Sequence, residues 1–445
     1  MEGVSMRVSC LVTMPARETL RSSAAAAFAA EPSGLAIDAV TDRAGFVLDR
    51  TFPALPIAGT HAGDVAFEAA APGQAPVFVA RGTVETNRLD ELGDRQSDFG
   101  VFADPEIGTF IVCPNNAPVG GTADVERKLD TAGLRAKGLD GKGAALAIMD
   151  TGVNLAHLKS RGLKHKLSRR YGWAPPGLPW TPGAYAVGHG TMCAYDALIA
   201  APRATLLDFP ILHSTTPGGS VMSGFLSDAL LAYSYLLSRI RTAAWRFSSL
   251  VVNNSWGMYH PSWDFPAGHP GRYADNPNHP FNLIVGTLAR AGVDILFAAG
   301  NCGANCPDGR CQGLVTNTIT GANAHPDVLT LAGCDTKDRR VGYSSQGPGI
   351  AGMSPDKPDV TAYTHFLGSE AYGPGRADGG TSTACPVAAG CVAALRTRLA
   401  AAQVPPASLF ATIRAQALGK PGPGWNPDYG TGIIRPLPVA THYGL

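Results

Sequence analysis

The sequence predicts an α/β protein in two parts: a large domain on a mostly parallel central sheet, and a small N-terminal α+β domain. Three observations support this class. From residue 125 onward short apolar runs alternate with helical patterns, whereas residues 1–112 mix strand and helix patterns at closer spacing. A segment rich in turn formers lies between them. The 445 residues are enough for one large domain and one smaller domain.

Residues 1–112 predict a split-βαβ, ferredoxin-like domain. The expected strands are MRVSCLVTM, LAIDAV, GFVLDRT, VFVARGTV and FGVFADP, and the expected helices are ARETLRSSAAAAFAA and TNRLDELGDRQ. A strand, a helix and paired strands, followed by a second helix and a last strand, form the order of that fold. The next segment, CPNNAPVGGTADV, is dominated by turn-forming residues and predicts a linker over residues 113–124.

Residues 125–445 predict the larger domain. Its apolar runs are ALAIMD, SLVVNNS, DILFAAG and VLTLAG, and the helical patterns between them include LSDALLAYSYLLSRI and FNLIVGTLARAG. Apolar strands that alternate with helices indicate a parallel sheet covered on both faces. In open sheets of this kind, functional side chains gather at the carboxyl ends of the strands.

The charge balance excludes two classes of partner. The chain has 36 basic and 35 acidic residues, without a long run of either sign. We therefore expect no nucleic acid and no polybasic membrane contact. No apolar stretch is long enough to span a bilayer, so we expect no membrane partner.

The alanine-rich segment near the N-terminus is interpreted as a helix, with a secretion signal as the alternative. LRSSAAAAFAA contains almost no Leu, Ile or Val beyond its first residue, and Glu18 lies just upstream. We therefore expect a cytoplasmic rather than a secreted protein. In that compartment the nine cysteines would be thiols rather than a disulfide framework.

Three polar residues stand where an apolar run ends or a helical pattern begins. Asp150 ends ALAIMD, His189 lies between two glycines in GHGTMCA, and Ser382 lies within GGTSTACPVAAG. Taken singly, each has a simpler interpretation as an Asx turn, a surface cap or a helix N-cap. An aspartic protease would need a second Asp-Thr-Gly or Asp-Ser-Gly to share a proton with Asp150, and the sequence contains none.

The surroundings of Ser382 favour a nucleophile. Gly379 and Gly380 remove side chains where another group must approach closely. The small-residue run after Ser382 predicts a buried helix, with Pro386 in its first turn, where no N–H partner is needed. Ser382 would then lie at a helix N-terminus, whose free N–H groups and dipole favour developing negative charge.

Together the three residues form the pattern of a hydrolytic triad. Their order along the chain, Asp–His–Ser, is that of subtilisin and differs from the orders in chymotrypsin-like enzymes and α/β-hydrolases. At this point the chain resembles a subtilase, a subtilisin-like serine protease, over roughly residues 125–435. The motifs that carry the resemblance are AIMDTGV, GHGTMCA, NNSWG, AAGN, GYSSQGPG with KPDVTA, GGTSTACPVAAG and YGTGIIRP.

The resemblance implies a subtilisin-like three-layer fold and a serine endopeptidase that works through an acyl-enzyme. Ser382 would attack the scissile carbonyl, His189 would act as the base, and Asp150 would orient the imidazole. Asn301, in AAGN, would supply an oxyanion donor together with the Ser382 N–H. Catalysis needs no cofactor and no metal, and structural calcium, which many subtilases carry, is left open because no site stands out.

By the same resemblance, a peptide or protein substrate would add as an extended strand beside two segments. These segments consist of Ser223, Gly224 and Phe225, and of Ser255, Trp256 and Gly257. The segments assigned to the first specificity pocket, SWG and AAGNCG, carry no acidic residue and are small apart from Trp256. They therefore suggest tolerance of an apolar residue rather than a requirement for Arg or Lys.

Subtilases are often made with a split-βαβ prodomain, and FGVFADPEI resembles the last strand of one. The resemblance implies that residues 1–112 act as an intramolecular inhibitor, with a processing segment within 105–125. A permanently attached accessory domain is the alternative.

Two further questions stay open at this level. Cys302, Cys306 and Cys311 follow Asn301 at a spacing that fits thiols, a local disulfide or a metal site. The enzyme could also be a maturation protease with a restricted substrate rather than a general one. The alternative from another class is a degenerate protease that acts as a peptide-binding module, although no triad residue is missing.

Overall fold

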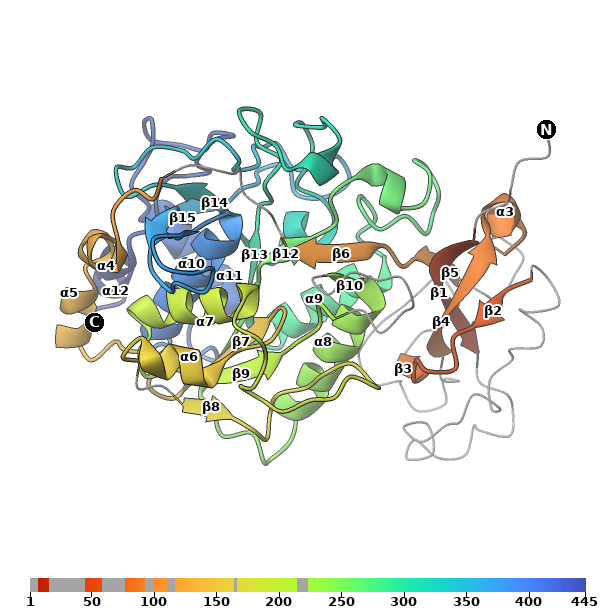
Figure 1. Cartoon of the computed structure of the whole chain (residues 1–445), viewed down its shortest axis with the longest axis horizontal. Helices are drawn as coiled ribbons and strands as arrows, with labels where there is room; N and C mark the ends of the chain where they lie inside the picture. The colour runs from red at the N-terminus through yellow and green to blue at the C-terminus, as the bar shows by residue number, and fades with distance from the viewer. Residues whose placement is uncertain are drawn as a thin grey trace.

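The computed structural model describes residues 7–15, 45–57, 77–92, 100–109, 117–163, 166–213 and 223–445. The predicted alanine-rich helix, the predicted strand LAIDAV and residues 113–116 of the predicted linker lie outside these ranges. Figure 1 shows a large α/β body with a small sheet beside it.

The large body is built on a seven-stranded sheet in the order β15-β14-β13-β11-β7-β9-β8. Every pair of neighbouring strands is parallel. The four predicted apolar runs form four adjacent strands of this sheet, β14, β13, β11 and β7. The strands are β7 Ala144–Met149, β8 Lys166–Ser168, β9 Thr205–Phe209, β11 Ser249–Asn254, β13 Asp294–Ala298, β14 Leu329–Cys334 and β15 Val360–Tyr363.

Alternate residues of a central strand enter two different hydrophobic cores. In β7, Ala145 and Ala147 lie in one core, while Leu146 and Ile148 lie in the other. Helices α8 (Leu226–Ile240) and α9 (Pro280–Arg290) contribute to the first core, and α7 (His189–Ala200) and α10 (Thr381–Leu395) to the second (Figure 1). Burial on both faces explains why these strands are continuously apolar. The predicted three-layer α/β fold is confirmed.

The remaining elements of the large body are short. Among the described residues, no helix has both the length and the apolar composition that crossing a bilayer requires. The helices are α4 Thr122–Leu129, α5 Thr131–Ala136, α6 Leu155–Ser160, α11 Pro406–Ala415 and α12 Pro436–His442; the 3₁₀ turns are η4 Pro261–Trp263, η5 Gly309–Cys311 and η6 Gly321–Ala324; a hairpin pairs β16 Phe366–Leu367 with β17 Ala377–Asp378.

The small N-terminal domain is an antiparallel sheet in the order β2-β4-β1-β5, with β3 also paired to β4. The predicted strand GFVLDRT is reduced to two residues, and the predicted helix TNRLDELGDRQ is, in its described part, a 3₁₀ turn followed by one helical turn. The elements are β1 Arg7–Pro15, β2 Val47–Leu48, β3 Leu55–Ile57, β4 Val77–Glu85, η3 Thr86–Arg88, α3 Leu89–Leu92 and β5 Gly100–Ala103.

The next strand, β6 (Glu106–Thr109), leaves the small sheet and enters the large body (Figure 1). There it is the middle strand of a three-stranded sheet, between β10 (Ser223–Phe225) and β12 (Trp256–Gly257). It runs antiparallel to both neighbours. The two parts of the chain are therefore joined by a shared sheet as well as by the connecting segment.

The start of the large body differs from the prediction. Helix α4 begins at Thr122, within the predicted linker 113–124. The Asp124 carboxylate accepts a hydrogen bond from the N–H of Gly121 at 2.9 Å. The residues that suggested a turn therefore cap a helix.

Candidate active site

Asp150 follows β7 directly, at the carboxyl edge of the sheet. Its backbone N–H donates to the Phe209 carbonyl at 2.9 Å, and its own carbonyl accepts from the Leu212 N–H at 3.1 Å. A carboxylate oxygen also accepts from the Thr151 N–H at 2.7 Å. Asp150 is fully buried. The sheet edge therefore fixes both its backbone and the direction of its carboxylate.

His189 is the first residue of α7 and contacts Asp150. Its Nδ1 lies 2.8 Å from Oδ1 and 2.9 Å from Oδ2 of the carboxylate. This partner favours a proton on Nδ1 and leaves Nε2 as the basic nitrogen. Gly190 permits the approach, because a Cβ there would lie 2.5 Å from the Gly152 carbonyl oxygen. The glycine after His189 is thus required by close backbone packing.

The serine helix begins earlier than predicted, and this corrects the expected role of Pro386. Because α10 begins at Thr381, Pro386 lies in the second turn and not in the first. Its missing N–H leaves the carbonyl of Ser382, four residues earlier, without a helical donor. Two other groups supply donors instead: Ser255 Oγ at 3.0 Å and Cys193 Sγ at 3.4 Å.

The helices that carry His189 and Ser382 pack closely against each other. A Cβ on Gly390 of α10 would lie 2.1 Å from the Ala197 carbonyl oxygen of α7. Only glycine allows this separation of the two helix backbones. The contact holds the two N-terminal ends of the helices at the same edge of the sheet.

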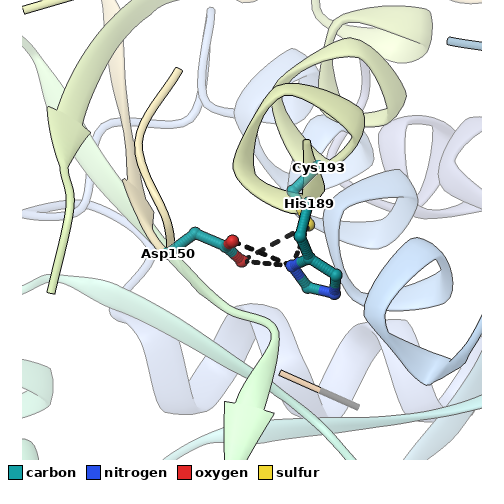
Figure 2. Close-up of side chains that lie close together, drawn as sticks. All are labelled: Asp150, His189 and Cys193. Atoms are coloured by element: carbon teal, nitrogen blue, oxygen red, sulfur yellow. Dashed lines mark hydrogen bonds and ion pairs between the residues drawn. The ribbon is translucent and has the colours of Figure 1, made fainter. Parts of the chain in front are cut away.

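One atom touches all three predicted triad residues. The Cys193 sulfur lies 3.5 Å from Asp150 Oδ2, 3.7 Å from His189 Nδ1 and 3.4 Å from the Ser382 carbonyl oxygen. Figure 2 shows the first two of these contacts from the Asp150–His189 side. The three predicted residues therefore meet at one place, although they are far apart in the sequence.

The bond between the serine and the histidine is not formed in this state. Ser382 Oγ donates to the Ser255 carbonyl at 3.3 Å. His189 Nε2 is buried and has no hydrogen-bond partner among the residues that the structure describes. Such bonds are often loose before substrate binds. A change in the serine side-chain torsion would redirect Oγ.

Asn301 lies just after β13 and is tied to the residue before Ser382. Its Oδ1 accepts hydrogen bonds from the Thr381 N–H at 2.9 Å and from Thr381 Oγ1 at 3.1 Å. The carbonyl side of the amide is thereby anchored, so the Nδ2 donors point away from Thr381. This orientation suits a donor for an oxyanion at Ser382.

The two predicted substrate segments flank β6. In β10, Ser223, Gly224 and Phe225 pair with Gly108, Ile107 and Glu106, and in β12, Trp256 and Gly257 pair with Thr109 and Gly108. The predicted edges thus face each other across a strand of the same chain. Their role toward substrate stays a prediction.

The side chain of Trp256 corrects one detail of the predicted pocket. It is fully buried, with its ring centroid 5.3 Å from that of Phe297 and 5.9 Å from that of Phe281. The indole therefore belongs to the hydrophobic core, and it is the backbone of Trp256 that pairs with β6. Sequence reasoning missed this because it could not tell which face of so short a strand is buried.

Comparison with known proteins identifies the family. The model of the subtilase family matches residues 141–432, more than half of the chain. The chain belongs to the subtilase family.

Individual relatives agree with this assignment. The human membrane-bound transcription factor site-1 protease is 33% identical over 156 residues, which are 33% of this chain and 14% of that protein. The mouse protein of the same name matches equally. The match thus spans about one seventh of the length of these relatives.

A solved structure agrees in fold. Fervidolysin from Fervidobacterium pennivorans, a keratinolytic enzyme related to subtilisin, matches with a TM-score of 0.59 and 16% identity. The match covers 99% of this chain and 62% of that one. At this level of identity the similarity shows the fold alone, which is that of a subtilisin-like protein.

The subtilase contains a buried acidic pair behind the triad that the sequence did not suggest. Burial raises the pKa of Asp196, on α7, well above its usual value, and the nearby Asp378 raises it further. Burial likewise raises the pKa of Asp378, on β17. Neither carboxylate oxygen of Asp196 has a hydrogen-bond partner among the described residues, so the neutral, protonated form suits this buried position.

The structure answers, for two of the three cysteines after Asn301, which of the three chemical states they adopt. Cys302 and Cys311 form a disulfide, which excludes both the thiol and the metal alternative for these two residues. The 3₁₀ turn Gly309–Cys311 brings the sulfurs together, and sequence spacing alone could not predict that turn.

Proposed function

We propose that this subtilase cleaves peptide bonds through an acyl-enzyme on Ser382. Ser382 Oγ attacks the scissile carbonyl carbon while His189 Nε2 accepts the hydroxyl proton. Asp150 holds the imidazole as the Nδ1–H tautomer and stabilises the imidazolium. The convergence of these three residues on Cys193 is the observation that supports the assignment.

The later steps use the same groups. The tetrahedral oxyanion accepts hydrogen bonds from the Asn301 amide and from the Ser382 N–H, which lies in the first helical turn and lacks a helical acceptor. The leaving amine departs with the proton held by His189, and the acyl group stays on Ser382. A water, deprotonated by His189, then attacks the acyl carbon; the bond to Ser382 Oγ breaks, the acid is released, and the proton on His189 returns to Oγ. We propose no cofactor, because each step uses only groups of this chain.

We also propose that the N-terminal part inhibits this site. Strand β6 fills the space between β10 and β12 and forms main-chain pairing with both. A substrate strand added at the same edges would need that space. As long as β6 is in place, a peptide substrate is therefore excluded.

Buried polar contacts support this inhibitory arrangement. Asp104, just before β6, accepts from the Ser227 N–H and from Ser227 Oγ, both at 2.8 Å. Arg81 of the small sheet lies 3.1 Å from a carboxylate oxygen of Asp228. Ser227 and Asp228 lie in the first turn of α8, where free N–H groups favour an acceptor.

The docking contact is expected to weaken as the pH rises. Burial raises the pKa of Asp104 to about 7, against the opposing effects of Arg81 and Ser227. The Asp104 carboxyl therefore binds its proton more tightly when the N-terminal part is docked than when that part is released and the carboxyl has its ordinary pKa. Docking is favoured at acid pH and loses this contribution as the pH rises from about 4 to about 7. In full-length Ser382→Ala protein, amide hydrogen exchange of residues 100–109 should show less protection at pH 8 than at pH 5.

The matched control is Asp104→Asn in the same background. The amide stays neutral at both pH values, so protection, corrected for intrinsic exchange rates, should depend less on pH; burial also raises the pKa of Asp228 in the same contact, so part of the dependence should remain. Equal pH dependence in both proteins would show that Asp104 does not control docking.

Activation should accompany loss of the N-terminal part. Purified full-length protein is incubated, and intact mass and labelling by a serine-directed fluorophosphonate are followed in the same samples. We expect labelling to rise as the mass falls by cleavage within residues 105–125. Full labelling of intact protein would contradict inhibition, and no labelling of cleaved protein would favour the degenerate, peptide-binding alternative.

We propose a restricted substrate rather than general digestion. The proposal rests on the name of the similar site-1 protease, which refers to cleavage at one site. A profile of cleaved sites in a whole proteome would contradict the proposal if it showed no preference beyond one residue.

A further inference from the structure

We propose that Arg310 and Tyr259 form a carbonyl clamp that binds a main-chain carbonyl of the peptide substrate; the inference rests on the proposed endopeptidase function. The carbonyl of Thr109, the last residue of β6, points to this role. It accepts hydrogen bonds from Arg310 Nη2 at 2.6 Å and from the Tyr259 hydroxyl. Thr109 is only 1% exposed, so its carbonyl depends on donors from the protein.

The clamp is held in place before any peptide arrives. The Arg310 guanidinium lies over the Tyr259 ring, 3.7 Å from its centroid. The opposite partner is Asp308, which receives Nε at 3.2 Å and Nη2 at 3.0 Å. A planar guanidinium with a two-point carboxylate partner and a stacked ring has little freedom left to lose.

The loop that carries Arg310 is joined to the catalytic centre. The Cys302–Cys311 disulfide closes the loop just after Asn301. Within it, the Asp308 N–H donates to the Asn301 carbonyl at 2.8 Å. Asn301, the proposed oxyanion donor, and Arg310 are therefore parts of one cross-linked loop, so a carbonyl on Arg310 would be positioned relative to Ser382.

In this structure β6 lies where we propose that the peptide substrate binds, so its contacts indicate those of a substrate. It makes main-chain pairing with β10 and with β12, and a peptide that takes its place must follow the same path. The carbonyl that Arg310 and Tyr259 hold belongs to Thr109, the residue of β6 that pairs with Trp256. Every residue presents such a carbonyl, so the clamp recognises the main chain and not the identity of a side chain.

The clamp makes activity depend on substrate length. A small acylating reagent reaches Ser382 without extending to the clamp. An extended peptide gains a hydrogen bond from a charged donor, and loss of such a bond corresponds to about a 10- to 100-fold change in affinity. Because the Arg310 side chain is 30% exposed, we expect the lower end of this range.

The test is Arg310→Gln in protein that has reached constant activity. The expected result is a KM for an extended peptide raised by about 10-fold, with kcat changed less than about 2-fold, because the bond acts equally in the ground and transition states. The rate of fluorophosphonate labelling should stay that of the wild type. Arg310→Lys and Tyr259→Phe should each give a smaller rise in KM.

Arg203→Gln is the matched control. Arg203 is an exposed arginine, also paired with a carboxylate, that of Asp140 at 3.2 Å, and its loss should leave KM unchanged. If Arg310→Gln shows normal labelling and normal KM, the clamp is refuted. If it only speeds release of the N-terminal part, Arg310 holds β6 alone, which also refutes the proposal. Absence of labelling in the wild-type protein would instead refute the endopeptidase function itself.

Discussion

Replacing Ser382 by alanine is expected to lower kcat on peptide substrates by about 10⁶-fold, the scale of loss known for the nucleophile of subtilisin. The hydroxyl is the atom that forms the acyl bond, and no nearby group can replace it. A thiol close to Ser382, that of Cys193, faces the Asp150 carboxylate and the Ser382 carbonyl, and burial raises its pKa well above the usual value. A protonated thiol is a weak nucleophile.

The measurement combines casein hydrolysis, fluorophosphonate labelling and intact mass. Ser382→Ala should neither hydrolyse casein nor react with the fluorophosphonate. It should keep its full mass, because it cannot cleave itself. Circular dichroism and melting temperature should be close to those of the wild type, since within the described residues Oγ makes a single hydrogen bond, to the Ser255 carbonyl.

Ser249→Ala is the matched control. Ser249 is also buried in the large body, and its Oγ has no hydrogen-bond partner in the described part of the chain. Its replacement should leave activity unchanged. Casein digestion by Ser382→Ala at the wild-type rate would end the triad assignment.

Replacing Asn301 by alanine is expected to lower kcat by about 10²–10³-fold, the cost known for the oxyanion-hole asparagine of subtilisin. The amide acts on the charge that develops in the transition state, so KM should change little. Initial rates over a range of peptide concentrations separate the two constants. An unchanged kcat would remove Asn301 from this role.

Stability must be followed in the same variant. Asn301 Oδ1 accepts from the N–H and the hydroxyl of Thr381, and loss of such an acceptor costs about 1–3 kcal/mol for each buried donor left without a partner. Rates are therefore compared well below the melting temperature. Asn305→Ala is the control, because Asn305 is an exposed asparagine of the same loop whose side chain bonds Arg340. Its kcat should match that of the wild type.

The elements of the large body that sequence reasoning predicted share one property: their patterns are local. Helix α8 (Leu226–Ile240) coincides with the predicted LSDALLAYSYLLSRI, and strand β11 (Ser249–Asn254) with SLVVNN. Turn formers misled the prediction at Thr122, where the same residues begin a helix. A short polar segment can cap a helix or form a linker, and the packing of the next residues along the chain decides between the two.

In the site, residue types and their order in the chain were sufficient to select Asp150, His189, Ser382 and Asn301 as candidates, with roles taken from the resemblance. They were not sufficient for Arg310, whose neighbours in sequence suggested only a cysteine cluster. One feature of the sequence could have pointed to Arg310. It is the one arginine between Cys302 and Cys311, and a short loop closed by a disulfide next to Asn301 keeps its side chain near the site. The hydrogen-bond partner on which the proposed role of Arg310 rests, the Thr109 carbonyl, is 201 residues away along the sequence, so no local pattern could reveal it.

The sequence by itself determined the class of fold and the candidates for the chemistry, because apolar periodicity and the polar residues that end each run are properties of neighbouring residues. Only the tertiary structure decided that Pro386 frees the Ser382 carbonyl for Ser255 and Cys193, that Trp256 turns into the core, and that β6 lies between β10 and β12. Each of these depends on which distant groups meet. Backbone hydrogen bonds and close packing choose those partners only when the whole chain is folded.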